Sequence, residues 1–252
     1  MTLDFHPAAR PAPARQRVIA HATTEARLIV RNGEQLVLAL VIPLALLIVA
    51  RFFGDRFGID AQAVAPSVLS LAMWSTCLTT LAIATGFERR YHVLERMAAT
   101  PLGKPGVLLG KALGIAAIAA GQALVLTAAG LALGWRPQPT VPALAVSALT
   151  AILAMAAFAG LALVLAGSLR PEATLAVANL LYLVGMPLGI LIPVAAYPSW
   201  VQPALSALPT AALGEAMRAA ADGTALLWPP AVAAVWAVVF WFLTRKVFSW
   251  TS

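Results

Sequence analysis

Six long apolar stretches alternate with short polar segments along this chain. About 20 consecutive apolar residues are enough for a helix to cross the hydrocarbon core of a bilayer. The pattern therefore predicts an all-α membrane protein with six transmembrane helices. The predicted spans are residues 35–53, 64–87, 107–134, 142–169, 172–193 and 226–244.

The segment before the first span has two different halves. Residues 1–14 are rich in proline and alanine, which predicts a disordered leader. In residues 15–33 apolar side chains recur at helical spacing, at Ile19, Ala22, Ala26 and Ile29. Basic residues flank this stripe, which favours an amphipathic helix lying in the inner membrane interface over a soluble helix whose stripe a partner covers. Residues 34–252 are predicted to form one transmembrane domain.

The composition agrees with a membrane protein. Hydrophobic residues make up 61% of the 252 residues and charged residues 11%, whereas soluble domains average about 25% charged residues. The mean hydropathy is +0.88. The formal charge is +7, but the basic residues lie beside the spans and are not gathered on one soluble domain, which argues against nucleic-acid binding.

The basic residues also predict the orientation of the chain. Thirteen of the 17 fall on one side when the segments between predicted spans are sorted, and four fall on the other. Cytoplasmic loops retain Lys and Arg. Both termini are therefore predicted to be cytoplasmic.

The most charged internal segment lies between the second and third predicted spans. It reads ERRYHVLERMAATPLGKPGVLLGK over residues 88–111. A continuous helix over residues 88–99 would place Phe87, Tyr91, Leu94 and Ala98 on one stripe. The charged residues, Arg89 among them, fall away from it. We call residues 88–111 the charged island, and its pattern predicts a docking element on the cytoplasmic face.

The segment before the last predicted span is too long for a simple turn. Residues 195–224 contain several prolines and then the helix-like stretch TAALGEAMRAAADG. Short helices that are broken by proline and cannot span the bilayer suggest an external hairpin that is re-entrant or lies at the interface.

Chemistry typical of enzymes and pumps is missing from the sequence. A phosphate-binding loop needs G-x-x-x-x-G-K-[ST], but Lys104 is followed by Pro105 and Lys111 by Ala112. No catalytic residues and no metal site are predicted, since all three histidines lie outside the spans. None of the ten acidic residues lies in the middle of a predicted span, which disfavours an ion-coupled carrier.

Two segments carry a resemblance to a known family. ERRYHVLERMAATPL at residues 88–102, followed by Gly110 and Lys111, is similar to the E-x-x-x-G-x-L-E-x-L-x-x-T-P coupling region of the ABC-2 type transport permeases, the membrane subunits of bacterial exporters. QPALSALPTAALGEAMR at residues 202–218 resembles the P-x-x-L-P-x-x-x-x-x-E-x-x-R element before their final span. His92 departs from the family, which often has glycine there, and is expected to leave the helix intact.

The resemblance implies partners and residue roles. Two permeases, identical or sister chains, would pair over two ATPase subunits that hold ATP and Mg, and this chain would bind no cofactor itself. The coupling residues would be Glu88, Arg89, Arg90, Tyr91, Leu94, Glu95, Arg96 and Met97, with the arginines facing acidic groups of the ATPase. The first, second and fifth spans would line the pathway with Trp74, Thr76, Thr80, Asn179, Tyr182 and Met186. The external hairpin would be marked by Pro209, Glu215 and Arg218.

The resemblance predicts an exporter subunit in the bacterial inner membrane, surrounded by membrane lipids. Its cargo would be drugs or other small amphiphilic, lipidic molecules, because burying unpaired polar groups of a cargo in an apolar cavity costs on the order of several kcal/mol. Two alternatives stay open at this point. A lipid-modifying membrane enzyme would need a polar catalytic cluster at one membrane face. A non-transporting anchor subunit would leave the external hairpin without a purpose.

Overall fold

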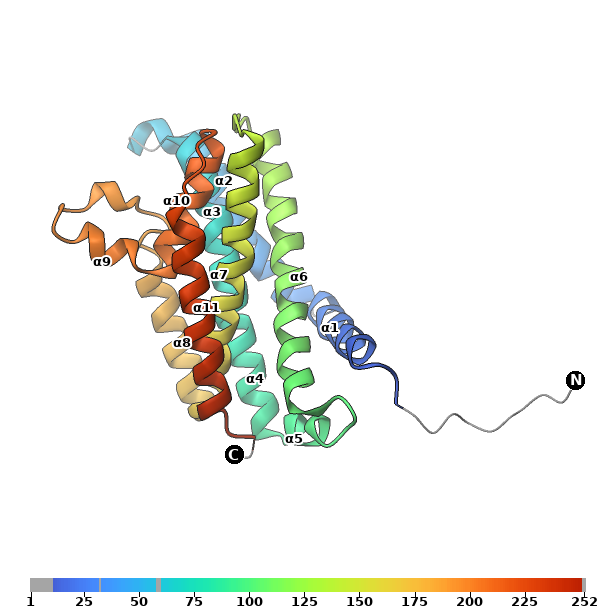
Figure 1. Cartoon of the computed structure of the whole chain (residues 1–252). Coiled ribbons are helices and arrows are strands. Elements are labelled where there is room, and N and C mark those ends of the chain that lie inside the picture. The colour runs from blue at the N-terminus through green and yellow to red at the C-terminus, as the bar shows by residue number, and fades with distance from the viewer. Residues whose placement is uncertain (1–10, 32, 58–59, 251–252) are drawn as a thin grey trace, which may run out of the picture.

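The computed structural model describes residues 11–31, 33–57 and 60–250, and all regular structure in these ranges is helical (Figure 1). Most of the predicted disordered leader lies outside the described residues. The α-helices are α1 (Ala14–Arg31), α2 (Gly33–Phe57), α3 (Ala61–Ser75), α4 (Leu81–Arg90), α5 (Val93–Ala98), α6 (Gly103–Ala132), α7 (Val141–Ser168), α8 (Pro171–Gly185), α9 (Gln202–Ser206), α10 (Pro209–Ala221) and α11 (Trp228–Val247). A π-helix, η1 (Thr76–Thr80), joins α3 to α4, and a 3-10 turn, η2 (Val194–Ala196), follows α8.

Four helical stretches among the described residues are long and apolar enough to cross a membrane. They are Gln62–Arg90, which runs through α3, η1 and α4, and the helices α6, α7 and α11. Two shorter apolar helices, Leu40–Gly54 within α2 and Pro171–Gly185, match the first and fifth predicted spans. An all-helical membrane domain is thus confirmed, with two of the six predicted spans shorter than the others.

The second half of the fifth predicted span is not helical. Helix α8 ends at Gly185, and the chain then turns back on itself through residues 186–193. Pro187 lacks a backbone N–H, and Gly189 has a φ of +89°, which residues with a Cβ rarely adopt. A Cβ at Gly189 would also lie only 2.3 Å from the Cα of Ala211. A helix over residues 172–193 was therefore a wrong prediction.

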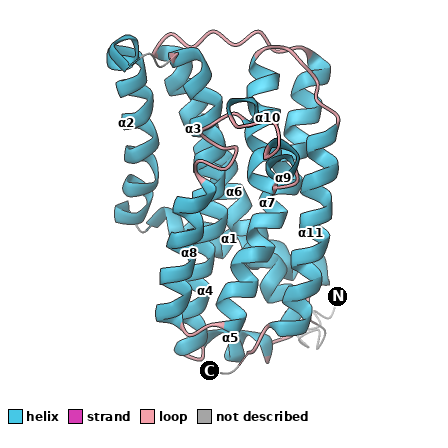
Figure 2. Ribbon diagram, turned by 90° about the vertical axis from the view of Figure 1, so that its left-hand side faces the viewer, coloured by secondary structure: helices cyan, strands magenta, loops and turns pink. Residues whose placement is uncertain are grey.

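Helix α7 forms the centre of the bundle, with α11, α10 and α4 packed along it (Figure 2). Its buried surface is made largely of alanine and glycine. At Gly160 a Cβ would come within 2.9 Å of the Cβ of Phe240 in α11. Small residues of this kind let membrane helices approach closely and gain van der Waals contact.

The leader helix α1 lies against α6 and runs obliquely to it (Figure 1). The contact uses Gly110 and Gly114, a pair with G-x-x-x-G spacing. A Cβ would lie 2.4 Å from the His21 ring at Gly110 and 2.9 Å from the Ala22 carbonyl oxygen at Gly114. Ala22 and Ala26 of the predicted stripe therefore meet α6, whereas Ile19 is exposed and His21 also faces α6.

The turns divide between the two ends of the bundle. The charged island, the turn between α7 and α8 and the end of α11 lie at one end, which we call the α5 end (Figure 1). The end of α2, the start of α3 and the α6–α7 and α10–α11 connections lie at the other end. This is the alternation that the six predicted spans require.

We expect Gly114→Leu to displace α1 from α6. The new side chain would overlap the backbone of α1, and overpacking of this kind costs about 1–3 kcal/mol. The measurement is the thermal unfolding midpoint of the detergent-purified protein, together with maleimide labelling of a cysteine introduced at Ala22, which should speed up. Gly121→Leu is the matched control, since a Cβ at Gly121 meets no atom within 4 Å. Equal effects of the two leucines would contradict this packing.

Candidate functional site

The charged island folds as two helices separated by a sharp turn. Helix α4 ends at Arg90 and α5 begins at Val93, with His92 between them at φ 56° and ψ 21°. This left-handed conformation closes the end of α4, where the N–H of Tyr91 donates to the Phe87 carbonyl. A continuous helix over residues 88–99 was a wrong prediction. His92 does not leave the helix intact, and it stands where left-handed backbone favours glycine.

The turn changes which residues of the island face outward. Tyr91 is 64% exposed, whereas Leu94 is fully buried. Had the helix continued, both would have lain on one stripe. The outward surface instead combines Tyr91, His92, Glu95 and Arg96, and we call these four residues the α5 surface. Met97 is half-buried beside them.

Arg89 points into the bundle and not toward a partner. It is 6% exposed, and its two terminal nitrogens each donate a 2.5 Å hydrogen bond to a carbonyl at the end of α7, of Gly167 and of Leu169. Helix ends leave carbonyls without helical partners, and Arg89 supplies donors for them. The prediction that Arg89 lies on the outer face of the island is therefore wrong. Arg90 is half-exposed and pairs with Glu172 at the start of α8.

Glu88 also points inward, to a buried cluster that the sequence did not predict. The Nζ of Lys111 lies 2.5 Å from Glu88 Oε2 and 2.8 Å from Glu25 Oε2. We call Glu25, Glu88 and Lys111 the inner ion cluster. The Lys111 side chain is 0% exposed, and a buried ammonium must be paired. The cluster therefore fixes α1, α4 and α6 to one another.

His21 stands beside the inner ion cluster, with Nε2 3.6 Å from Glu25 Oε1. Its burial against α6 lowers the pKa of the imidazole below its usual value, more than the nearby Glu25 raises it. The imidazole is thus predominantly neutral at neutral pH. One signal could have found the cluster, because Lys111 falls inside a predicted span and a charged residue in a span requires a partner.

The residues predicted to line the pathway do not form one group. Thr76 and Thr80, both in η1, border a cleft of about 280 Å³ between α1, α2 and α6. The hydroxyl of Thr76 donates to Gln122 Oε1 at 2.6 Å. Asn179 lies on another helix, α8, where its side chain is exposed. It does not line the cleft that the two threonines border.

Trp74, Tyr182 and Met186 lie together where α3 meets the end of α8. Trp74 Nε1 donates to the carbonyl of Tyr182 at 3.4 Å. The Trp74 ring meets Phe158 edge to face with a centroid distance of 4.6 Å. With 4% of its surface exposed, Trp74 belongs to the packed core of the single chain.

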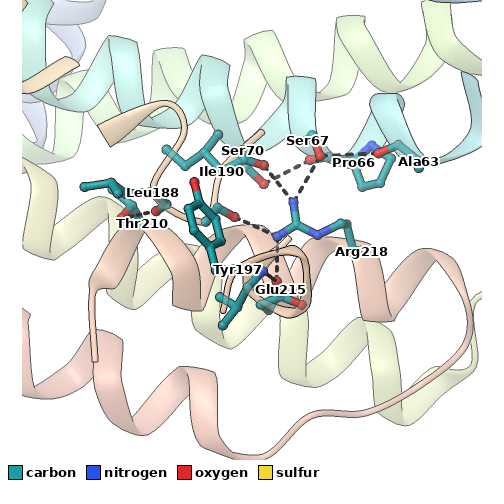
Figure 3. A network of polar contacts seen from close by, with 12 residues as sticks. Ala63, Pro66, Ser67, Ser70, Leu188, Ile190, Tyr197, Thr210, Glu215 and Arg218 are labelled. Carbon is teal, nitrogen blue, oxygen red and sulfur yellow. Dashed lines mark hydrogen bonds and ion pairs between the residues drawn. The ribbon is translucent and has the colours of Figure 1, made fainter. Parts of the chain in front are cut away.

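The segment before α11 forms a hairpin that is held by Arg218 (Figure 3). Pro209 is buried at the start of α10, and α10 packs against α3, α7 and α11. Arg218 donates to the carbonyls of Gly189 at 2.6 Å and Ile190 at 2.7 Å, where the chain turns back after α8. Glu215 Oε1 accepts from Arg218 and from the backbone N–H of Val194, each at 2.8 Å. Glu215 and Arg218 therefore hold the hairpin against the bundle.

A second cleft opens beside this hairpin, between α2, α3 and residues 191–193. Its volume is about 400 Å³, and its lining is mainly apolar. Polar groups enter it only from Asp60, Ser67 and Arg218, as far as the described residues show. The apolar lining comprises Leu46, Val49, Ala50, Gly54, Ala63, Val64, Val68, Leu191 and Pro193.

We expect His92→Gly to be at least as stable as the parent protein and His92→Val to be less stable. A left-handed residue with a Cβ costs about 1–2 kcal/mol, which glycine avoids. Both variants lose the contact between His92 and Glu95, so their comparison isolates the backbone. The same pair at Arg96, whose backbone is helical, should show the opposite order because glycine weakens helices. The measurement is the thermal unfolding midpoint of the four purified variants. If glycine and valine ranked in the same order of stability at positions 92 and 96, the left-handed turn at His92 would be contradicted.

Arg218→Met is expected to lower the free energy of unfolding by at least about 2 kcal/mol, because it leaves buried carbonyls without donors at about 1–3 kcal/mol each. Residues 186–201 should also become sensitive to limited proteolysis. Arg136→Met serves as the control, since Arg136 is exposed and the hydrogen bonds of its side chain go to nearby carbonyls, those of Leu131 and Trp135, while its backbone N–H, which the variant keeps, donates to Gln62. Similar losses in both variants would rule out the special role of Arg218.

Comparison with known proteins agrees with this architecture. A model of the ABC-2 family transporter proteins matches residues 35–245, from α2 to the last turn of α11. None of the curated proteins compared with the chain matches it. The matched region includes both segments that carried the resemblance, the charged island and the hairpin held by Arg218. The chain belongs to the ABC-2 family of transporters as a membrane permease, a domain without a nucleotide-binding site of its own.

Proposed function

We propose that this chain is the permease subunit of an ABC exporter that moves drugs or other amphiphilic, lipidic molecules out of the cytoplasm or the inner leaflet. The family implies an ABC ATPase partner, and that separate subunit would hold ATP and Mg. The observation that carries the proposal is the α5 surface. It presents the exposed aromatic side chain of Tyr91, in the turn after α4, next to the exposed Arg96 on α5, a short helix that Leu94 anchors in the bundle.

The α5 surface has the composition of a docking site. Tyrosine and arginine are enriched among the residues that dominate binding at protein interfaces. Tyr91 and Arg96 are both exposed, and Glu95 and His92 lie 3.2 Å apart next to them. Charges at such a rim steer association and select the partner. We propose that the α5 surface, with Arg90 and Met97 at its edges, seats in the ATPase subunit.

The contacts that attach α5 to the other helices support transmission of force from α5 into the bundle. Leu94 anchors α5 in the interior, and Arg89 connects the preceding turn of α4 to the end of α7. The inner ion cluster connects the same turn to α1 and α6. A displacement of α5 would therefore be shared by four helices, without a flexible segment between the ATPase and the spans.

The clefts support an amphiphilic cargo. The cleft beside the hairpin offers a mainly apolar wall with Asp60, Ser67 and Arg218 as its polar groups. The smaller cleft offers Thr76, Thr80 and Gln122 in an apolar setting. Such surfaces match a molecule with a large apolar part and a few polar groups. We propose that both clefts take part in the pathway.

A second permease, identical or a sister chain, is part of the proposal. The outer faces of α2 and α8 carry large exposed apolar residues, with Asn179 among them. In lipid a polar side chain on such a face is costly, which supports a partner helix or the pathway next to Asn179. The proposed location is the bacterial inner membrane with both termini cytoplasmic, because the α5 end carries most of the basic residues.

The combined change Tyr91→Ala and Arg96→Glu should remove productive coupling. Loss of an anchor residue and reversal of a rim charge are expected to weaken ATPase binding by about tenfold or more. The measurement is vanadate-sensitive ATP hydrolysis by the partner ATPase, reconstituted with the permease, together with its co-purification. Both should fall while the thermal unfolding midpoint of the permease stays unchanged.

Arg56→Glu is the control, because Arg56 is an exposed arginine in the last turn of α2, at the opposite end of the bundle. It should leave hydrolysis intact. Hydrolysis that survives the double change at Tyr91 and Arg96 would contradict the docking site. Labelling of a cysteine at Val93 from outside intact cells would contradict the proposed orientation.

A further inference from the structure

A third cleft opens between α6 and α11 at the α5 end, and neither the coupling surface nor the proposed pathway uses it. Its volume is about 530 Å³. One wall comes from the first turns of α6, and the other comes from the end of α11 and the residues that follow. The lining residues are Lys104, Pro105, Leu108, Leu109, Trp241, Thr244, Arg245, Phe248 and Trp250.

The described lining of the cleft carries two cations and no acidic side chain. Lys104 on one wall and Arg245 on the other are both exposed. In the described part of the chain neither lies within ion-pair distance of a carboxylate. Lys104 Nζ lies 5.6 Å from the centre of the Trp250 ring. Among the described residues, the two cations of the cleft therefore have no carboxylate partner, and an anion would neutralise them.

The rest of the lining is apolar and well fixed. The Trp241 ring is held by a hydrogen bond of 3.0 Å from its Nε1 to the carbonyl of Ala156 in α7. The Phe248 ring packs against the Trp250 ring in a tilted arrangement, with 4.9 Å between the ring centroids. Leu109 in the lining is exposed on the outer face of α6, and Phe242 is exposed on the outer face of α11. These faces belong to helices long and apolar enough to cross a membrane, so acyl chains would reach the cleft directly.

We propose that this cleft binds an anionic phospholipid. The phosphate lies between Lys104 and Arg245, and an acyl chain lies along Leu109 and Trp241. Basic pockets between transmembrane helices on the cytoplasmic side recognise anionic headgroups in this way. A small soluble phosphate would use the two cations but leave the apolar wall in water. An acidic protein segment would likewise leave that wall uncovered, so the lipid fits the whole lining best.

The test is lipid binding by the purified, delipidated full-length chain, which needs neither the ATPase nor transport. Native mass spectrometry follows titration with phosphatidylglycerol and, separately, with phosphatidylcholine of the same acyl chains. We expect a preference for phosphatidylglycerol, and we expect Lys104→Gln with Arg245→Gln to weaken its binding by at least about tenfold. Binding of phosphatidylcholine should change little.

The matched control removes the same charge from the same end. Arg170→Gln with Lys246→Gln neutralises two exposed cations that do not line the cleft, and this variant should keep the preference. Thermal unfolding checks that both double variants are folded. Brominated phosphatidylglycerol should quench the tryptophan fluorescence of the parent protein more than that of the variant with Trp250→Phe.

Three results would overturn the proposal. The first is an unchanged preference for phosphatidylglycerol in the variant that lacks Lys104 and Arg245. The second is an equal loss in the control variant, which would mean general attraction to a basic surface. The third is displacement of the lipid by millimolar glycerol phosphate, which would identify a soluble phosphate as the ligand.

Discussion

Every backbone polar group inside a bilayer needs a partner within the protein, and this requirement shapes the bundle wherever a helix stops. Lipid offers no hydrogen bonds, so an unpaired carbonyl there costs several times the thermal energy. At the end of α7 the donors come from Arg89 and the backbone N–H of Ser249, and at the turn after α8 they come from Arg218. The guanidinium groups of both arginines are bonded to backbone carbonyls inside the protein. Neither group is therefore available to contact a partner protein.

The same requirement explains how broken helices can coexist with a rigid bundle. The stretch that follows α8, residues 186–193, is not helical, yet Arg218, Glu215 and Thr210 bond carbonyl and N–H groups between Leu188 and Val194 (Figure 3). The inner ion cluster adds a second kind of connection. A buried ion pair contributes little net stability, because desolvation offsets the attraction, but removing one partner is costly. Its effect is to keep α1, α4 and α6 in one arrangement.

Much of this fold could be predicted from hydropathy alone, because the spans and their alternation follow from apolar length. The spacing of Gly110 and Gly114 permits a close helix contact, but it does not identify α1 as the partner of α6. The turn at His92 was missed because the spacing of the apolar residues favoured a continuous helix, although histidine adopts left-handed backbone more often than most residues with a Cβ. The inward direction of Arg89 was missed for another reason. A charged residue in a sequence pattern is normally expected to face water or a partner protein. The carbonyls that accept from this guanidinium lie 78 and 80 residues further along the chain, so no local pattern reveals them.

The π-helix at Thr76–Thr80 has a consequence for how the long span behaves. Its wider turn holds one residue more than an α-helical turn, and one residue corresponds to a rotation of about 100° around the helix axis. This one additional residue therefore determines the direction, around the helix axis, in which every later side chain of the span points, including those of Glu88 and Arg89. If the π-helical turn moved along the span by one turn, the residues that it passed would rotate around the helix axis. Most backbone hydrogen bonds of the span would be kept during this movement. A transporter built on such a span could change the surface that faces its cargo without unwinding the helix.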